Sequence, residues 1–105
     1  MGGMTTLLAH PEREEIRITS VLHALADPVR LRIVRALAAH EEGISCGVLD
    51  LGVTASTLTH HVRTLREAGV VRVRPQGTSR ISSLRRDDLD TLYPGLLDGV
   101  LAAQR

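Results

Sequence analysis

The sequence predicts a mostly α-helical domain with one β-hairpin, built from about five or six helices and a two-stranded sheet. Apolar residues recur at helical spacing in several segments, most clearly in residues 54–69. Two short β-prone runs follow directly, separated by a turn at Gly77. A chain of 105 residues has room for one modest core, so residues 10–105 are expected to form a single domain behind a flexible arm at residues 1–9.

The first helix is expected at about residues 11–25. Proline is favoured in the first turn of a helix, and the glutamates after Pro11 suit the positive end of the helix dipole. Ile18, Val21, Leu22 and Leu25 then form an apolar stripe.

Asp27 and Pro28 mark the start of a second helix, because aspartate accepts backbone hydrogen bonds at an N-cap and proline needs no N–H partner there. The segment VRLRIVRALAA follows, with Arg32 and Arg35 expected outward. Its expected inward residues are Leu31, Val34, Leu37 and Ala38.

A short helix capped by Ser45 and a break at Gly52 are expected next, followed by a helix at residues 54–68. Thr54 suits the N-cap of this helix, and Gly69 suits a left-handed residue at its C-terminal end. The residues expected to face the core are Leu58, His61, Val62 and Leu65. The opposite face carries Ser56, Thr59, His60 and Arg63. His61 is therefore interpreted as a packed, hydrogen-bonded histidine, whereas His60 faces outward.

Residues 70–84 predict a β-hairpin. Val71 and Val73 alternate with Arg72 and Arg74, so one face is buried and the other is cationic. A short helix, a glycine turn, a second amphipathic helix and a basic hairpin, in this order, predict a winged helix-turn-helix fold.

Two further helices are expected after the hairpin, one capped by Asp87 and Asp88 and a last one beginning at Pro94. The last helix carries more apolar surface than so small a domain can cover. Together with the stripe on the first helix, it predicts a homodimer. The residues expected at the dimer interface are Ile18, Val21, Leu22, Leu96, Leu97, Val100 and Leu101.

Charge is segregated along the chain. The formal net charge is only +1, yet residues 52–86 hold seven arginines and a single glutamate. Such a local positive field suits a polyanion. Tyr93 is the only aromatic residue, which argues against a single-strand binder that stacks bases. No segment is long and apolar enough to span a bilayer, so a cytoplasmic protein is expected.

Over roughly residues 22–101 the chain resembles the ArsR/SmtB winged-helix transcriptional regulators of bacteria. The likeness rests on the runs ALADPVRLRIVRAL, STLTHHVRTLREAGVV and RPQGTSRISSL. The first two runs at this separation form a more specific signature than either run alone. The resemblance implies a homodimeric repressor that binds double-stranded DNA at a palindromic operator and responds to an effector.

The resemblance also implies which residues contact DNA, with helix 54–68 in the major groove. The family's base-reading positions fall on Ser56, Thr57, Thr59, His60 and Arg63, with Thr54 and Ala55 at the helix entry. Ala55 stands where many relatives have a polar residue such as Gln, so one base contact would be missing. On hairpin 70–84, contacts to phosphates or the minor groove are expected from Arg72, Arg74, Gln76 and Arg80, with Arg85 and Arg86 beside them.

Many members of the family bind metals through cysteine pairs near the short helix, or through Asp and His on the last helix. Here Cys46 is the only cysteine, and residues 87–105 contain no histidine. The remaining metal candidates are Cys46 and the pair His10 and Glu14, which share a face if the first helix begins there. A metal-responsive regulator for Ni, Zn or Co is therefore one alternative. The other inputs left open are a redox signal, with Cys46 as a sensor thiol, a small molecule and a partner protein.

An enzyme is not expected, because Cys46 has no neighbouring base in the sequence and no glycine-rich phosphate loop occurs. The other alternative is a winged-helix module that binds a protein without reading DNA. Arginine on both helix 54–68 and the hairpin favours DNA, since an interaction module has no need of that charge.

Overall fold

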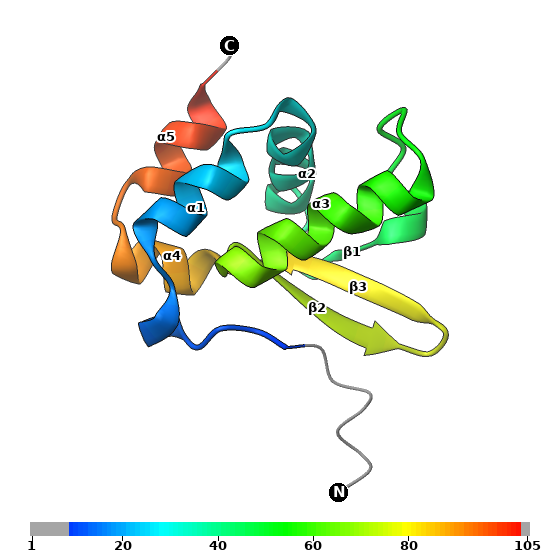
Figure 1. Ribbon diagram of the computed structural model, residues 1–105, viewed down its shortest axis with the longest axis horizontal. Coiled ribbons are helices and arrows are strands. Elements are labelled where there is room, and N and C mark those ends of the chain that lie inside the picture. Colours follow the sequence, from blue (N-terminus) through cyan, green and yellow to red (C-terminus); the bar gives the residue numbers. More distant parts are fainter. Residues whose placement is uncertain (1–8, 104–105) are drawn as a thin grey trace, which may run out of the picture.

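The computed structural model describes residues 9–103, which form five α-helices and a three-stranded antiparallel sheet (Figure 1). The helices are α1 (Ile18–Leu25), α2 (Pro28–Ala38), α3 (Ala55–Ala68), α4 (Arg86–Leu92) and α5 (Leu96–Ala102), and the strands are β1 (Ile44–Ser45), β2 (Val71–Gln76) and β3 (Ser79–Leu84). Two 3₁₀ turns lie at Arg13–Glu15 and Cys46–Val48. Apart from Ala9, the arm expected at residues 1–9 lies outside the described residues. Within them, every helix is too short or too polar to cross a bilayer.

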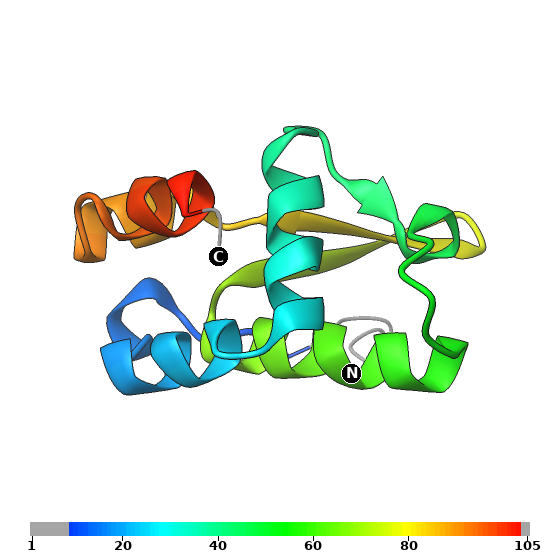
Figure 2. The same cartoon turned by 90° about the horizontal axis from the view of Figure 1, so that it is seen from above.

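The sheet has the strand order β1-β3-β2, so the predicted hairpin is confirmed and gains a third, short strand. The hairpin runs from the pair Val71 and Leu84 to the pair Gln76 and Ser79, and Gly77 supplies the turn. Figure 2 shows α3 on one side of the hairpin, whereas α4 and the C-terminal end of α2 lie on the other.

One core connects all of these elements. Its largest fully buried side chains are Ile33, Leu37, Leu65, Leu89 and Leu97, which come from α2, α3, α4 and α5. The C-terminal helices therefore share their packing with α2 and α3 and do not form a separate unit.

The second helix forms with the predicted start, but Ile33 is buried in place of Leu31 and Ala38, which are half-buried. The Asp27 carboxylate accepts hydrogen bonds from the backbone N–H groups of Val29 at 2.8 Å and Arg30 at 3.1 Å, and thereby caps α2. Val34 and Leu37 point into the core.

The helix expected at residues 11–25 is wrong in its first half. A single 3₁₀ turn ends at Ile16, which has an extended backbone, and α1 begins only at Ile18. Ile16 is 7% exposed and packs against Gly69, while its carbonyl accepts a hydrogen bond of 3.1 Å from the Tyr93 hydroxyl. These tertiary contacts outweigh the local preference for helix, which is worth about 0.5 kcal/mol per residue.

The short helix expected before Gly52 is also wrong. Only the 3₁₀ turn Cys46–Val48 forms there, and Val48 is 71% exposed. The preceding residues instead form β1, which pairs with β3. Gly43 allows this close approach: it has φ +98°, and a Cβ there would lie 2.6 Å from the Ile81 side chain.

The two C-terminal helices begin elsewhere than expected: α4 begins earlier, at Arg86, and α5 begins later, at Leu96. Arg85 occupies the N-cap of α4 without a side-chain cap, and Asp87 and Asp88 lie in the first turn of that helix. Pro94 does not begin α5, because Gly95 adopts φ +87° at its N-cap.

Candidate nucleic-acid interface

Helix α3 presents the predicted polar face to solvent. Its buried residues are Leu58, Val62, Leu65 and Ala68. The exposed residues of the opposite face are Ser56, Thr59, His60 and Arg63. Thr54 caps its start and Gly69, with φ +89°, ends it, so the predicted bounds of this helix are confirmed.

The hydroxyl groups at the start of α3 bind one another. The Thr54 hydroxyl accepts a hydrogen bond from the backbone N–H of Thr57 at 3.2 Å and donates one to the Thr57 hydroxyl at 2.9 Å. It also lies 3.3 Å from the Ser56 hydroxyl. Thr54 and Thr57 therefore fix the helix entry, whereas the side chains of Thr59 and Arg63 make no hydrogen bond within residues 9–103.

His61 packs as predicted, and its partner is an arginine that the sequence analysis missed. The His61 Nδ1 lies 3.1 Å from the Arg30 Nη1, and arginine can only donate, so Nδ1 accepts and the ring proton sits on Nε2. Arg30 is 8% exposed and also donates to the Ala24 carbonyl at 2.6 Å. Arg30, Ile33, Val34 and Leu37 share the spacing of one buried helix stripe, a signal that could have placed this arginine inside.

The hairpin arginines divide between its two faces. Val71 and Val73 point into the core. Residues paired across an antiparallel ladder point to the same side, and Arg80 pairs with Pro75, two positions after Val73. Arg80 therefore lies on the face that packs against the core and α3.

Arg72, Arg74 and Gln76 lie on the opposite face of the hairpin, by the same alternation. Arg74 donates to the Gln76 side chain at 2.7 Å and to the Glu42 carbonyl at 3.2 Å. Arg72 approaches a carboxylate of α4. The structure therefore brings Arg80 alone of these residues to the α3 side.

The expectation that Arg85 and Arg86 meet phosphates is wrong for Arg85. This side chain is only 4% exposed and binds Asp88 at 2.8 Å and the Pro11 carbonyl at 2.8 Å. Arg86 pairs with Asp98 and lies 3.4 Å from Asp90.

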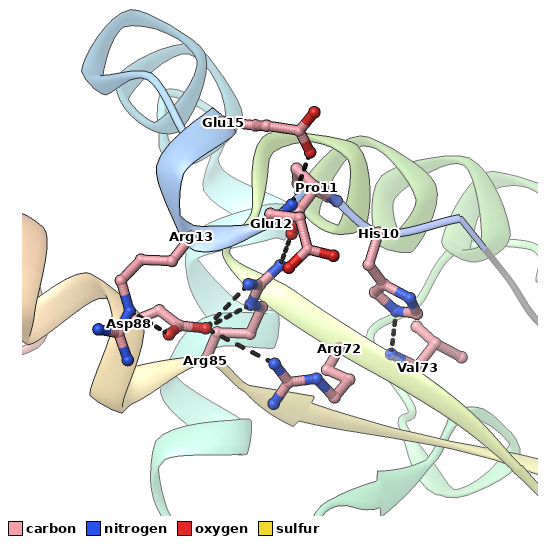
Figure 3. A network of polar contacts seen from close by, with 9 residues as sticks. All are labelled: His10, Pro11, Glu12, Arg13, Glu15, Arg72, Val73, Arg85 and Asp88. Carbon is pink, nitrogen blue, oxygen red and sulfur yellow. Dashed lines mark hydrogen bonds and ion pairs between the residues drawn. The ribbon is translucent and has the colours of Figure 1, made fainter.

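Asp88 is the centre of a network that connects three parts of the chain (Figure 3). Its carboxylate receives Arg13 at 2.8 Å, Arg85 at 2.8 Å and Arg72 at 3.6 Å. Burial acts to raise the pKa of Asp88, but the hydrogen bonds and charges of Arg13 and Arg85 outweigh it and hold the pKa below its ordinary value. The network therefore fixes the segment before α1 against the hairpin and α4.

Two of the residues considered for a metal, His10 and Glu14, do not come together. The His10 Nε2 accepts a hydrogen bond of 3.0 Å from the backbone N–H of Val73, and Glu14 is exposed in the 3₁₀ turn Arg13–Glu15. The described residues contain no group of three or more His, Cys, Asp or Glu placed to hold an ion. Among the described residues, the structure therefore offers no set of ligands that would support a metal site.

The apolar residues expected at a dimer interface fall into two groups. Ile18 and Leu22 on α1 are 38% and 49% exposed, and α5 adds half-buried Leu96, Val100 and Leu101. Both helices lie at the same end of the molecule (Figures 1 and 2). Val21 and Leu97 are fully buried within the chain itself, so their assignment to the interface surface is corrected.

An exposed polar helix next to a basic hairpin is the surface by which winged helix-turn-helix proteins bind duplex DNA. The convex face of α3 suits the major groove, which is about 12 Å wide and admits an α-helix.

The comparisons with known proteins agree with this class. Residues 25–74 match the model of a helix-turn-helix domain. The HTH-type transcriptional regulator YceK of Bacillus subtilis is 34% identical over 87 residues, which cover 81% of this chain and 86% of that protein. The transcriptional repressor SmtB homolog of Synechocystis is 35% identical over 75 residues, covering 71% of this chain and 57% of that one.

A solved structure of an ArsR family transcriptional regulator superimposes with a TM-score of 0.65 at 18% identity, over 84% of this chain and 92% of that one, which shows a shared fold. The chain belongs to the helix-turn-helix transcriptional regulators, a family of DNA-binding proteins and not of enzymes, and it shares the winged helix-turn-helix fold of an ArsR family member.

Proposed function

We propose that the chain is a homodimeric repressor that reads a palindromic operator, with α3 in the major groove and the Arg80 face of the hairpin on the adjoining phosphates. The observation that carries the proposal is the exposed face of α3, where Thr59, His60 and Arg63 project to solvent. The Synechocystis relative is a transcriptional repressor homolog by name, which supports repression as the direction of control.

Two arginine substitutions distinguish contacts to base edges from contacts to phosphates. Arg63→Ala removes a side chain placed to contact base edges, so discrimination between operator and random duplex should fall by about 1 to 3 kcal/mol. Arg80→Ala should weaken binding to both duplexes alike and reduce the dependence of affinity on salt by about one counterion. Fluorescence anisotropy with an operator selected from a random library, at two salt concentrations, measures both effects.

Arg72→Ala is the matched control, because Arg72 lies on the hairpin face away from α3 and next to Asp88. It should change the affinity for DNA less than either other substitution. If Arg63→Ala leaves the ranking of bound sequences unchanged, α3 does not read bases.

The dimer is expected to form through the exposed apolar residues of α1 and α5. Leu22→Glu places a charge in this surface and should give a monomer with weakened operator binding. Val48→Glu changes a more exposed apolar residue, in the turn Cys46–Val48, and should leave the dimer intact. Light scattering at micromolar protein measures the mass. A wild-type chain that is monomeric there would overturn this part of the proposal.

A further inference from the structure

A cleft of about 490 Å³ lies between the C-terminal end of α2, the base of the hairpin and the start of α4. Arg72, which borders it, lies on the face of the hairpin opposite Val71 and Val73. We name this cavity the α2–α4 cleft. Its lining residues include Arg13, His40, Arg72, Arg85, Arg86 and Asp88. We propose that the α2–α4 cleft binds a small oxyanion, a phosphate or carboxylate group, between Arg13 and Arg72.

The first argument is the local balance of charge. Three guanidinium groups from three separate segments converge on one carboxylate, that of Asp88. Arg85 is buried and satisfied by Asp88 and by the Pro11 carbonyl, so the remaining excess of positive charge rests on Arg13 and Arg72. Arg86 also borders the cleft, but it pairs with carboxylates of α4 and α5.

The second argument is that Arg13 and Arg72 retain donors. Arg13 binds Asp88 through Nε at 2.8 Å, and the closest approach of Arg72 to Asp88 is 3.6 Å, beyond a hydrogen bond. The terminal nitrogens of Arg13 have no other hydrogen-bond acceptor within residues 9–103. The two side chains are 46% and 52% exposed and reach Asp88 from different sides (Figure 3). Guanidinium groups bind phosphate and carboxylate oxygens through paired hydrogen bonds, which makes such donors suitable for an oxyanion.

The third argument concerns size and access. The cleft borders Arg72, on the hairpin face opposite the one that packs against α3, so a duplex held on α3 leaves room for a small anion to enter. Glu41 and Asp87 also border the cleft; both are exposed and form no ion pair within the described residues, and the charge of Asp87 acts on Arg13 less than that of Asp88 does.

Binding of an anion in the α2–α4 cleft would affect the position of the hairpin. Arg72 belongs to β2, and Arg13 belongs to the N-terminal segment, residues 10–16, which binds β2 through His10 and packs on the end of α3 through Ile16. An anion that draws Arg13 and Arg72 together therefore acts on residues that hold the hairpin in place.

The test uses the full chain without DNA, so its outcome is independent of operator binding. Inorganic phosphate is titrated at constant ionic strength, while the arginine Nε–H signals are followed by NMR and the heat of binding by calorimetry. Saturable binding is expected, with Arg13 and Arg72 signals shifting most. Arg13→Gln and Arg72→Gln should each weaken it by about tenfold or more, whereas Arg63→Gln on α3 should leave it unchanged.

Asp88→Asn provides a readout of opposite sign, because it removes the carboxylate that competes for the same arginines, so phosphate should bind more tightly. A merely structural role of the network would not give this gain. Circular dichroism confirms that each variant folds. The proposal is overturned if millimolar phosphate causes no saturable shift, or if the Arg13→Gln and Arg72→Gln variants bind phosphate as the wild type does.

Discussion

Gly69 is the residue at which three parts of the chain meet. It ends α3 with φ +89°, precedes β2, and lies against Ile16 of the N-terminal segment. A Cβ at this position would lie 2.5 Å from the Ile16 Cγ1, closer than packed carbon atoms allow. The absence of a side chain therefore serves both the backbone conformation and the packing of a distant segment.

Substitution by alanine separates these two roles. Gly69→Ala should lower the free energy of unfolding by roughly 2 to 5 kcal/mol, the sum of a left-handed backbone cost and a steric clash. Gly52→Ala is the matched control: it also has a positive φ, of +75°, but open space around the site, so the backbone cost of about 1 to 2 kcal/mol should remain alone. Urea unfolding measures both variants. Equal losses would show that Ile16 does not restrict this site.

Asp88 predicts a pH dependence of stability. Its pKa is lowered in the folded chain, so its contribution is present above the ordinary aspartate pKa of about 4 and is lost as the pH falls below that value. Asp88→Asn should destabilise the fold at pH 7 by about 1 to 3 kcal/mol, because buried Arg85 loses its charged partner.

The difference in unfolding free energy between wild type and Asp88→Asn should stay constant from neutral pH down to about pH 5 and shrink below about pH 4. Urea titrations at a series of pH values measure this. A difference that grows on acidification would contradict the assignment of a charged Asp88.

At the scale of elements, the Asp27 cap fixes where α2 begins. Asp27→Ala removes the acceptor for two backbone N–H groups and should cost about 1 kcal/mol, within a range of roughly 0.5 to 2. Asp27→Asn keeps a side-chain oxygen at the N-cap and should cost much less. Thermal unfolding of the pair gives the comparison, and an equal loss in both variants would mean that charge, not capping, is what Asp27 supplies.

The elements that were predicted well are those whose signals are local. Helices α2 and α3 have a cap, a periodic apolar stripe and, for α3, a terminal glycine, and the hairpin has strict alternation. The first half of the expected first helix failed because Ile16 is held by Gly69 and Tyr93, which are 53 and 77 positions away in the sequence. β1 was missed because two residues carry no periodicity, and its partner strand lies far along the chain.

At the candidate interface, too, only the features set by local sequence patterns were predicted. The outward face of α3 follows from helical spacing and was predicted in full. Arginines were harder to place, because the same side chain can bind solvent, a phosphate or a buried carboxylate. Arg85 and Arg30 turned inward where the fold supplied acceptors, namely Asp88 for the first and the end of α1 for the second.

At the scale of the whole molecule, the shared core predicts that the domain unfolds as one unit. Tyr93 is the only aromatic residue and lies next to α5, so its fluorescence reports the C-terminal end, whereas far-UV circular dichroism reports all helices. The two signals should give the same midpoint in urea. An earlier transition of Tyr93 would show that α4 and α5 separate from α2 and α3 before the rest unfolds.

The two faces of the hairpin also restrict how this protein can diverge. One additional residue within β2 would reverse the alternation, turning Val71 and Val73 to solvent and their neighbouring arginines into the core. Changes of length are therefore tolerated only at the turn around Gly77, where backbone alternation ends. Homologues should accordingly vary the wing by substitution along its strands and by insertion only at its tip.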